Sequence, residues 1–597
     1  MERDSNLHDE RLMKNSVLFN RLLKYMKGYY KNYILAIILM ALLVGLDLLI
    51  PFMLGKVLEE LGEDVINFKW ILTLVLTSVG LLTASKTLSY VNTMLLCRTS
   101  NKIVFRIREI VLEHIQKMSH SQFNNIPIGK LVTRATNDVN TLFDLYNNVL
   151  LSLLRNTVTI IGVFVAMFLI NSKLALILLI IVPILFTLAF IFRYFSRRAH
   201  RKVRERLSNM NAFLSENISG MKITQVFNEE DKKYKEFYEN NQSLKKSYIH
   251  EIFVFGIFRP SIFLLYILSI GLVLWFGGNE AIDVNLGVIA VGLEFSELYM
   301  FTNYVSRFFN PIQSLADQFN QLQSAFASAE KIYSILDTPS EIEDSEDAVE
   351  IDLTGDIEFK DVWFYYVPGE WVLKGVSFHI HPNDTIAFVG ATGSGKTTIL
   401  SLITRNYDIQ RGEILINGID IKKIKLECLR RQVGQMLQDV FLFSGTVETN
   451  ISMNDPAITH EEVVEASKYV NASKFIDKLT NGYDEETRER GNNFSLGQRQ
   501  LISFARTIVH KPKVMILDEA TSNIDTETEV LIQDSLNKIM ALGTVIVVAH
   551  RLSTIQHATC IYVFQDGEII ESGTHQELLA NHGRYYKLYL LQFDNSL

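Results

Sequence analysis

The chain has 597 residues, too many for one hydrophobic core, and its 48% hydrophobic composition with a mean hydropathy of +0.15 is high for a soluble protein. We therefore expect part of it to lie in a membrane. The formal net charge of -8 gives no general electrostatic reason for nucleic-acid binding, and three cysteines far apart in sequence do not support a disulfide framework or a cysteine metal site.

Six apolar stretches in the first half are long enough to span a bilayer, and none follows Pro339. They cover approximately residues 33–54, 70–95, 146–170, 174–193, 252–276 and 284–308. The polar, charged segment before them does not resemble a cleavable signal peptide. The first half is therefore expected to be an all-α membrane domain of six transmembrane helices.

Lysine and arginine are unevenly divided among the connecting segments. Residues 1–32, 96–145 and 194–251 hold seven, seven and twelve, whereas the segments between the other ends of the spans hold at most two. The positive-inside rule therefore places both termini in the cytoplasm. The two long basic loops contain few helix breakers, namely Pro127, Gly129 and Gly220, each near the middle of its loop. This pattern predicts helical hairpins that project about 40 Å.

An acidic stretch at residues 338–353 is poor in large apolar side chains, as expected of a linker. Short strands, turns and amphipathic helices follow it, which is typical of an α/β domain. We predict a cytoplasmic tail with an elbow helix at 1–32, a transmembrane domain at 33–335, a linker at 336–354 and an α/β domain at 355–597.

A glycine-rich loop begins this second domain. Residues 390–397 read Gly-Ala-Thr-Gly-Ser-Gly-Lys-Thr, between the apolar run 385–389 and a second apolar run at 398–403. In such a strand-loop-helix unit the backbone N–H groups surround a triphosphate, Lys396 reaches the β and γ phosphates, and Thr397 ligates Mg²⁺. The predicted ATP contacts are Gly390, Thr392, Gly393, Ser394, Gly395, Lys396, Thr397 and Thr398.

An apolar run at 514–517 ends in Asp518 and Glu519. Two carboxylates at the end of a buried strand suit Mg²⁺ for the first and a polarised attacking water for the second. In the same domain as Lys396, this pattern predicts hydrolysis of the nucleotide.

With these motifs the chain resembles an ATP-binding cassette (ABC) transporter of the exporter type, over nearly its whole length. The resemblance implies a P-loop ABC nucleotide-binding domain at 355–597. Tyr366 matches the aromatic residue that stacks on adenine, Gln438 the glutamine that contacts Mg²⁺ and the attacking water, and His550 the histidine that contacts the γ-phosphate. Residues 522–525 match the loop that crosses the dimer interface.

The two hairpin tips also resemble family segments. Residues 122–134 with Asn137 and Asp138, and residues 216–222, resemble the tips that seat on the ATPase domains. Residues 489–491 resemble the segment of the ATPase domain that touches those tips.

The signature motif departs from the family pattern Leu-Ser-Gly-Gly-Gln. Here residues 494–498 read Phe-Ser-Leu-Gly-Gln, which retains the expected nucleotide contacts Ser495, Gly497 and Gln498. Leu496 replaces the glycine that permits close backbone approach to the partner's γ-phosphate. This resembles heterodimeric bacterial exporters with one working and one degenerate ATP site, so we expect a second, different half-transporter as partner. A homodimer that tolerates Leu496 is the alternative.

Charged residues inside a span usually face a cavity or a partner, because each costs about 2.5–3.5 kcal/mol at mid-bilayer. Glu294 and Glu297, on one face of the sixth span, and Asp47 on the first are therefore substrate candidates, and acidic groups near aromatic rings favour amphipathic or cationic compounds. An equally weighted alternative is that they line water or form hydrogen bonds within the bundle.

These patterns predict a multi-pass half-exporter of a bacterial plasma membrane that uses ATP and Mg²⁺, acts on hydrophobic or amphipathic small molecules, contacts membrane lipid and binds no nucleic acid. A homodimeric lipid or peptide translocator would share every motif. Six predicted spans argue against a soluble ABC ATPase. An ABC importer is also not expected, because importers generally keep the membrane and ATPase domains on separate chains.

Overall fold

The computed structural model describes residues 13–63, 65–285, 294–436, 440–518, 526–548 and 555–594. Two units enclose separate cores: a helical unit of Met1–Ile115 with Gly129–Thr338, and an α/β unit of Gln116–Ile128 with Pro339–Leu597.

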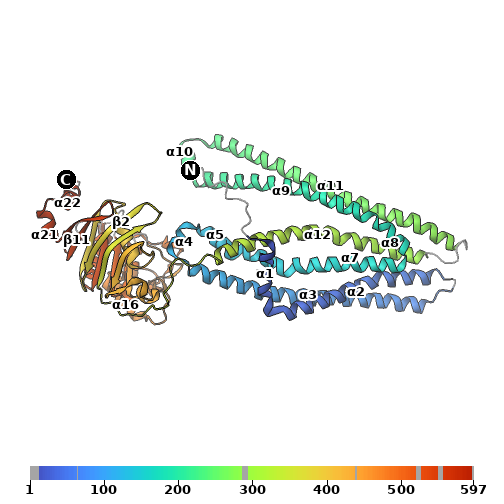
Figure 1. Ribbon diagram of the computed structural model, residues 1–597, viewed down its shortest axis with the longest axis horizontal. Coiled ribbons are helices and arrows are strands. Elements are labelled where there is room, and N and C mark those ends of the chain that lie inside the picture. Colours follow the sequence, from blue (N-terminus) through green and yellow to red (C-terminus); the bar gives the residue numbers. More distant parts are fainter. Residues whose placement is uncertain are drawn as a thin grey trace. The chain divides into compact units, whose positions relative to one another are not determined.

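The helical unit consists of long helices joined by short ones (Figure 1). Two π-helical segments, Arg134–Asp138 and Leu145–Val149, lie between α5 and α7. The helices are α1 (Asn15–Met26), α2 (Tyr30–Leu61), α3 (Phe68–Gln116), α5 (Ile128–Thr133), α6 (Val139–Asp144), α7 (Leu150–Ile170), α8 (Ser172–Leu179), α9 (Ile181–Ser219), α10 (Met221–Val226), α11 (Glu230–Asn285) and α12 (Phe295–Leu336).

Five helical stretches of the described chain are long and apolar enough to cross a membrane, and they contain the first five predicted spans. The sixth prediction, 284–308, falls partly on residues 286–293, outside the described residues, and its remainder ends α11 and begins α12. α11 continues past the predicted end of the fifth span at residue 276 and ends at Asn285.

The two predicted cytoplasmic hairpins are helical. α3, α9 and α11 contain 49, 39 and 56 residues, and a helix of 56 residues is about 84 Å long, far more than the hydrocarbon core of a bilayer. The second hairpin turns at Gly220, which caps α9, and α9 and α11 then run side by side (Figure 1).

The predicted elbow helix is α1, which packs against the bundle. Leu18 and Leu22 of α1 are buried in one core with Tyr146, and the Tyr146 hydroxyl donates a hydrogen bond to the Leu22 carbonyl at 2.8 Å. α1 is therefore held against the bundle by contacts between segments far apart in sequence.

The pair α9–α11 meets the other helices through α8 and α12. Its apolar side chains otherwise remain largely uncovered within this chain: Phe190 is 74% exposed, and Ile223 and Phe227, at the α10 tip, are 65% and 72% exposed. These faces are available for lipid or for a second subunit.

The α/β unit is built on two sheets, with strand orders β2-β1-β4-β5 and β12-β11-β3-β10-β9-β6, and a small β7-β8 pair. In the six-stranded sheet all neighbours run parallel except the edge strand β12. The strands are β1 (Ile357–Tyr365), β2 (Trp371–Ile380), β3 (Thr385–Gly390), β4 (Arg411–Ile416), β5 (Ile419–Asp420), β6 (Val433–Met436), β7 (Gly445–Thr446), β8 (Glu486–Thr487), β9 (Val514–Asp518), β10 (Thr544–Val548), β11 (Cys560–Gln565) and β12 (Glu568–Gly573).

Helices of this unit enclose two apolar cores together with the two sheets. The helices of the unit are α4 (His120–Asn125), α13 (Lys396–Ile403), α14 (Leu426–Gln432), α15 (Val447–Ser452), α16 (His460–Tyr469), α17 (Ser473–Ile476), α18 (Leu496–Val509), α19 (Thr526–Met540), α21 (His575–Ala580) and α22 (Arg584–Asp594).

The acidic segment predicted as a linker lies along the α/β unit. Val349 forms a parallel bridge with Ile424, and the Glu350 carboxylate pairs with Lys425 at 2.8 Å. The carbonyl of Glu343 also accepts a hydrogen bond from Arg405 at 3.1 Å. Acidic and backbone groups of this segment therefore pair with basic side chains of the same unit.

Candidate functional site

The glycine-rich loop joins β3 to α13, as predicted. Parallel neighbours β10 and β11 flank β3, so the loop leaves the carboxyl end of a central strand, where parallel sheets place ligand sites. Gly395 caps α13 in a left-handed conformation, φ +104°, and an added Cβ would lie 2.7 Å from Leu373 Cδ2. A side chain at this position would be strained in the left-handed conformation and would have to displace the Leu373 side chain.

Lys396 is drawn into the loop. Its ammonium donates hydrogen bonds of 2.8 Å to the carbonyls of Gly390 and Ala391, and its side chain is almost fully buried. Burial lowers the pKa of Lys396, and the Asp518 carboxylate opposes that shift. A buried ammonium at a helix N-terminus fits a phosphate group, because a phosphate can replace the loop carbonyls as its partner.

The remaining loop residues divide by exposure. Ser394 and Thr398 are buried, whereas Thr392, Gly393 and Thr397 are exposed. Thr397 is thus open to a ligand at the first turn of α13, and Asp518 ends β9 on the same sheet. Oxygen donors of this kind fit Mg²⁺.

Three predicted site residues lie outside the described residues: Glu519, Gln438 and His550. The segment 522–525 does so too. Their positions in sequence directly follow the described ends of β9, β6 and β10. Their roles stay predictions.

Tyr366 stands at the end of β1 with half of its surface exposed. Its hydroxyl lies 3.1 Å from Thr398 Oγ1, and its ring meets Phe364 and Tyr407 edge-on at 4.8 and 5.1 Å. An exposed aromatic face fixed beside the phosphate loop suits stacking on a base.

Tyr407 connects this ring to α4. Its hydroxyl accepts a hydrogen bond of 3.1 Å from Asn124, and its ring lies 5.8 Å from that of His120. α4 is itself anchored by Gln122, whose side-chain amide donates a hydrogen bond of 2.7 Å to the Pro339 carbonyl. α4, which holds the first residues of the predicted first hairpin tip, is therefore part of the α/β unit and packs against Tyr407, the neighbour of Tyr366. Sequence analysis missed Tyr407, because an isolated tyrosine after a helix carries no motif.

The altered signature lies at the start of α18. Ser495 caps the helix and exchanges two hydrogen bonds with Gln498, at 2.9 and 3.2 Å. Phe494 stands where the family pattern has leucine. Its side chain is buried in the apolar core, so this substitution changes core packing and not the surface of the motif. Leu496 is half-buried in the first helical turn, beside the buried Gly497. Leu496 is therefore the departure that changes the surface of this turn.

Asp47 lies in a polar pocket of about 320 Å³ between α2, α7 and α12, a volume within the range of small-molecule sites. Its carboxylate accepts a hydrogen bond from Ser85 at 2.8 Å and lies 3.7 Å from Arg155. Arg307 also lines the pocket, and no residue of the described chain pairs with it. Two arginines and one aspartate leave an excess of positive charge.

Glu294 and Glu297 lie apart from this pocket. Glu294 precedes α12 with extended backbone, and its N–H donates to the Glu297 carboxylate at 3.2 Å. The Glu294 carboxylate accepts from Ser296 at 3.4 Å. These contacts are local to the start of α12.

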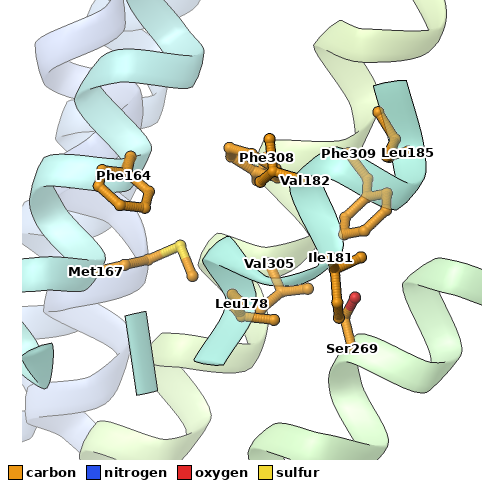
Figure 2. A pocket seen from close by; sticks show the side chains of 10 residues that line it. All are labelled: Phe164, Met167, Leu178, Ile181, Val182, Leu185, Ser269, Val305, Phe308 and Phe309. Carbon is orange, nitrogen blue, oxygen red and sulfur yellow. The ribbon is translucent and has the colours of Figure 1, made fainter. Parts of the chain in front are cut away.

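A second, apolar pocket lies between α7, α8, α9, α11 and α12, and Figure 2 shows the side chains that line it. Phe308, Phe309 and Met167 are among its walls, and its cavity volume of about 10 Å³ holds no more than one water. In this conformation it is packed core.

Residues 33–311 match the family of ABC transporter transmembrane regions, and residues 373–522 match the ABC transporter family. The chain is 39% identical over 521 residues to the probable multidrug resistance ABC transporter ATP-binding/permease protein YheH of Bacillus subtilis, covering 86% of this chain and 76% of that one. It is 33% identical over 579 residues to the ATP-dependent lipid A-core flippase of Syntrophus aciditrophicus, covering 96% and 94%.

The solved structure of a bacterial Atm1-family ABC exporter with ATP bound shares the fold, with a TM-score of 0.78, 23% identity and coverage of 97% of this chain and 99% of that one. A phosphate loop fused to membrane-crossing helices defines an ATP-driven membrane transporter. The chain belongs to the ABC transporters, as an exporter-type half-transporter with its ATPase domain in the cytoplasm.

Replacing Gly395 by alanine should weaken ATP binding by about tenfold or more, because the left-handed turn and the contact with Leu373 both oppose a Cβ. Titration of the purified protein with a fluorescent ATP analogue measures this. Gly418→Ala is the matched control: its φ is +76°, but an added Cβ meets nothing within 4 Å. Equal losses in both variants would contradict the role assigned to the turn.

Replacing Tyr407 by alanine should leave ATP affinity within about twofold of wild type but reduce the stimulation of ATP hydrolysis by transported compounds, since α4 loses its contact beside Tyr366. Phosphate release with and without such compounds measures the effect. Tyr407→Phe keeps the ring and should retain most of the stimulation. A Tyr407→Ala variant that is stimulated like wild type would contradict this link.

Proposed function

We propose that this chain is one half of a dimeric exporter that couples ATP hydrolysis to the export of hydrophobic or amphipathic compounds. The observation that carries the proposal is the buried Lys396 in the β3–α13 loop of a chain that also supplies membrane-crossing helices. The multidrug and lipid A-core names of the two relatives support amphipathic substrates.

In the proposed ATP site, Lys396 and the loop amides hold the phosphates, while Tyr366 stacks on adenine. Thr397, Asp518 and Gln438 would hold Mg²⁺, which neutralises charge on the phosphates when bound. Glu519 polarises the attacking water, and His550 contacts the γ-phosphate. ATP bound between two cassettes closes them, and the hairpin tips carry that closure to the membrane helices.

The partner is proposed to be a different half-transporter. Leu496 places a branched side chain in the first turn of α18, where closure brings backbone against the partner's nucleotide. The site formed with this signature would be degenerate. The working site would combine Lys396, Asp518 and Glu519 with the partner's consensus signature.

Native mass spectrometry of the complex, isolated by a tag on this chain, tests that assembly. We expect a 68.3 kDa chain bound to a subunit of different mass. A species of twice that mass would show a homodimer in which Leu496 is tolerated.

Replacing Glu519 by glutamine should lower ATP turnover by about 10²–10⁴-fold, the usual contribution of a group that assists proton transfer. Phosphate release from the purified complex measures it, and unchanged binding of an ATP analogue confirms that the site is still formed. Substantial turnover in this variant would remove Glu519 from the proposed role.

A second candidate is a lipid translocator, favoured by the charges around Asp47. Arg155 occupies that carboxylate, and Arg307 leaves a positive charge beside it. An amphiphile with an anionic or zwitterionic headgroup fits this pocket better than the cation expected from the isolated acidic residues.

Replacing Arg307 by glutamine should therefore weaken the stimulation of ATP hydrolysis by anionic amphiphiles about several-fold. The stimulation by neutral compounds should change little. Glu294→Gln is the matched comparison, because that carboxylate lies apart from the pocket. Loss of stimulation by cations alone in the Glu294 variant would favour the cation-binding role.

A further inference from the structure

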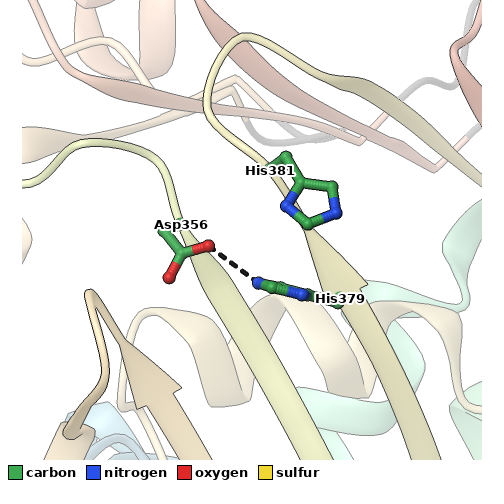
Figure 3. A group of neighbouring side chains, drawn as sticks. All are labelled: Asp356, His379 and His381. Carbon is green, nitrogen blue, oxygen red and sulfur yellow. Dashed lines mark hydrogen bonds and ion pairs between the residues drawn. The ribbon is translucent and has the colours of Figure 1, made fainter.

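Three metal-binding side chains meet at one edge of the four-stranded sheet (Figure 3). Asp356 precedes β1, His379 belongs to β2, and His381 follows it. The register pairs Ile357 with Ile380, which puts Asp356 across from His381. Residues two apart on a strand share a face, as do residues directly opposite each other, so all three side chains project from the same side of the ladder.

The donor atoms are already close. Asp356 Oδ1 and His379 Nε2 are 2.7 Å apart, the two imidazole rings have centroids 4.2 Å apart, and one donor atom from each residue lies within 4.8 Å of the others. Donors around a tetrahedral ion with bonds of about 2.0–2.2 Å are about 3.3–3.6 Å apart. Small side-chain rotations suffice, since both histidines are exposed.

The backbone on either side of the cluster is fixed by other contacts. The N–H of His381 donates to the Asp384 carboxylate at 2.9 Å, and the carbonyl of Asp356 accepts from the Asn417 N–H at 3.0 Å. Because the backbone that carries these ligands is already fixed, metal binding loses little backbone conformational entropy.

The donor types select the metal. Two imidazole nitrogens and one carboxylate suit Zn²⁺ and neighbouring first-row ions, whereas Mg²⁺ and Ca²⁺ prefer oxygen ligands alone. Exposure leaves a fourth position to water. Glu358, opposite His379 on the same face, adds a negative charge that its ion pair with Lys360 partly compensates.

We propose that Asp356, His379 and His381 form a surface site for Zn²⁺ or a similar transition-metal ion, which joins β1 to β2. The site uses none of the residues that hold ATP or Mg²⁺ in the proposed function, and it stands independently of transport. A metal bound here would stabilise the four-stranded sheet.

The test uses the full-length protein, purified in detergent with a tag that contains no histidine. Zn²⁺ is titrated against a chromogenic chelator, and Co²⁺ is titrated while its visible absorption spectrum reports tetrahedral nitrogen and oxygen ligation. We expect one such site per chain. His381→Ala is expected to lower the metal affinity by about tenfold or more, because the loss of a ligand should cost at least as much as the loss of a contact that orients one.

His381→Ala is the most informative variant, because the His381 side chain forms no hydrogen bond with any described residue. The unfolding temperature of this variant without metal should therefore match that of the wild type. Asp356→Asn should also weaken binding. His460→Ala is the matched control: His460 pairs with Glu448 at 2.8 Å on the surface of the same unit, without a third ligand.

The proposal is overturned if wild-type protein shows no Zn²⁺ or tetrahedral Co²⁺ site at micromolar metal. Equal affinity in His381→Ala and wild type would also overturn it, leaving Asp356 and His379 as a simple ion pair. So would a loss of the same size in the His460 control. An ATP affinity unchanged in all variants would separate this result from the proposed transport function.

Discussion

The position of the Lys396 ammonium inside the glycine loop is the interaction on which the rest of the α/β unit depends. Its bonds to the carbonyls of Gly390 and Ala391 direct the carbonyl side of the loop inward. Gly395 then brings the loop against Leu373 of the smaller sheet, and Thr398 meets Tyr366. Both sheets therefore share one turn, and a ligand held there contacts elements from each.

The membrane pocket illustrates a different constraint. A charge in an apolar medium requires a partner, and Asp47 finds two, Ser85 and Arg155, on two other helices. These bonds connect α2 to α3 and α7. The same contacts that satisfy Asp47 also reduce the attraction of its carboxylate for a further cation.

Sequence alone predicted the parts of this protein that are specified locally. The glycine loop, the strand before Asp518, the apolar helices and the turns at Pro127 and Gly220 each follow from residues adjacent in the chain. Local patterns do not predict contacts between segments that are far apart in the sequence. Tyr407 gains its role only from α4, nearly three hundred residues earlier in the chain, and the partners of Asp47 lie on separate helices. The basic partners of the acidic segment before the ATPase domain, such as Lys425, occur far downstream, so its ion pairs cannot be predicted from the segment itself.

The uncovered α10 tip bears on how much of this protein a cell can maintain. Ile223 and Phe227 form an apolar knob at the end of a hairpin that extends into the cytoplasm. A copy in which this tip stays uncovered would display apolar side chains to chaperones and proteases, which act on such surfaces. Degradation of such copies would then limit the amount of the protein without any regulation of transcription.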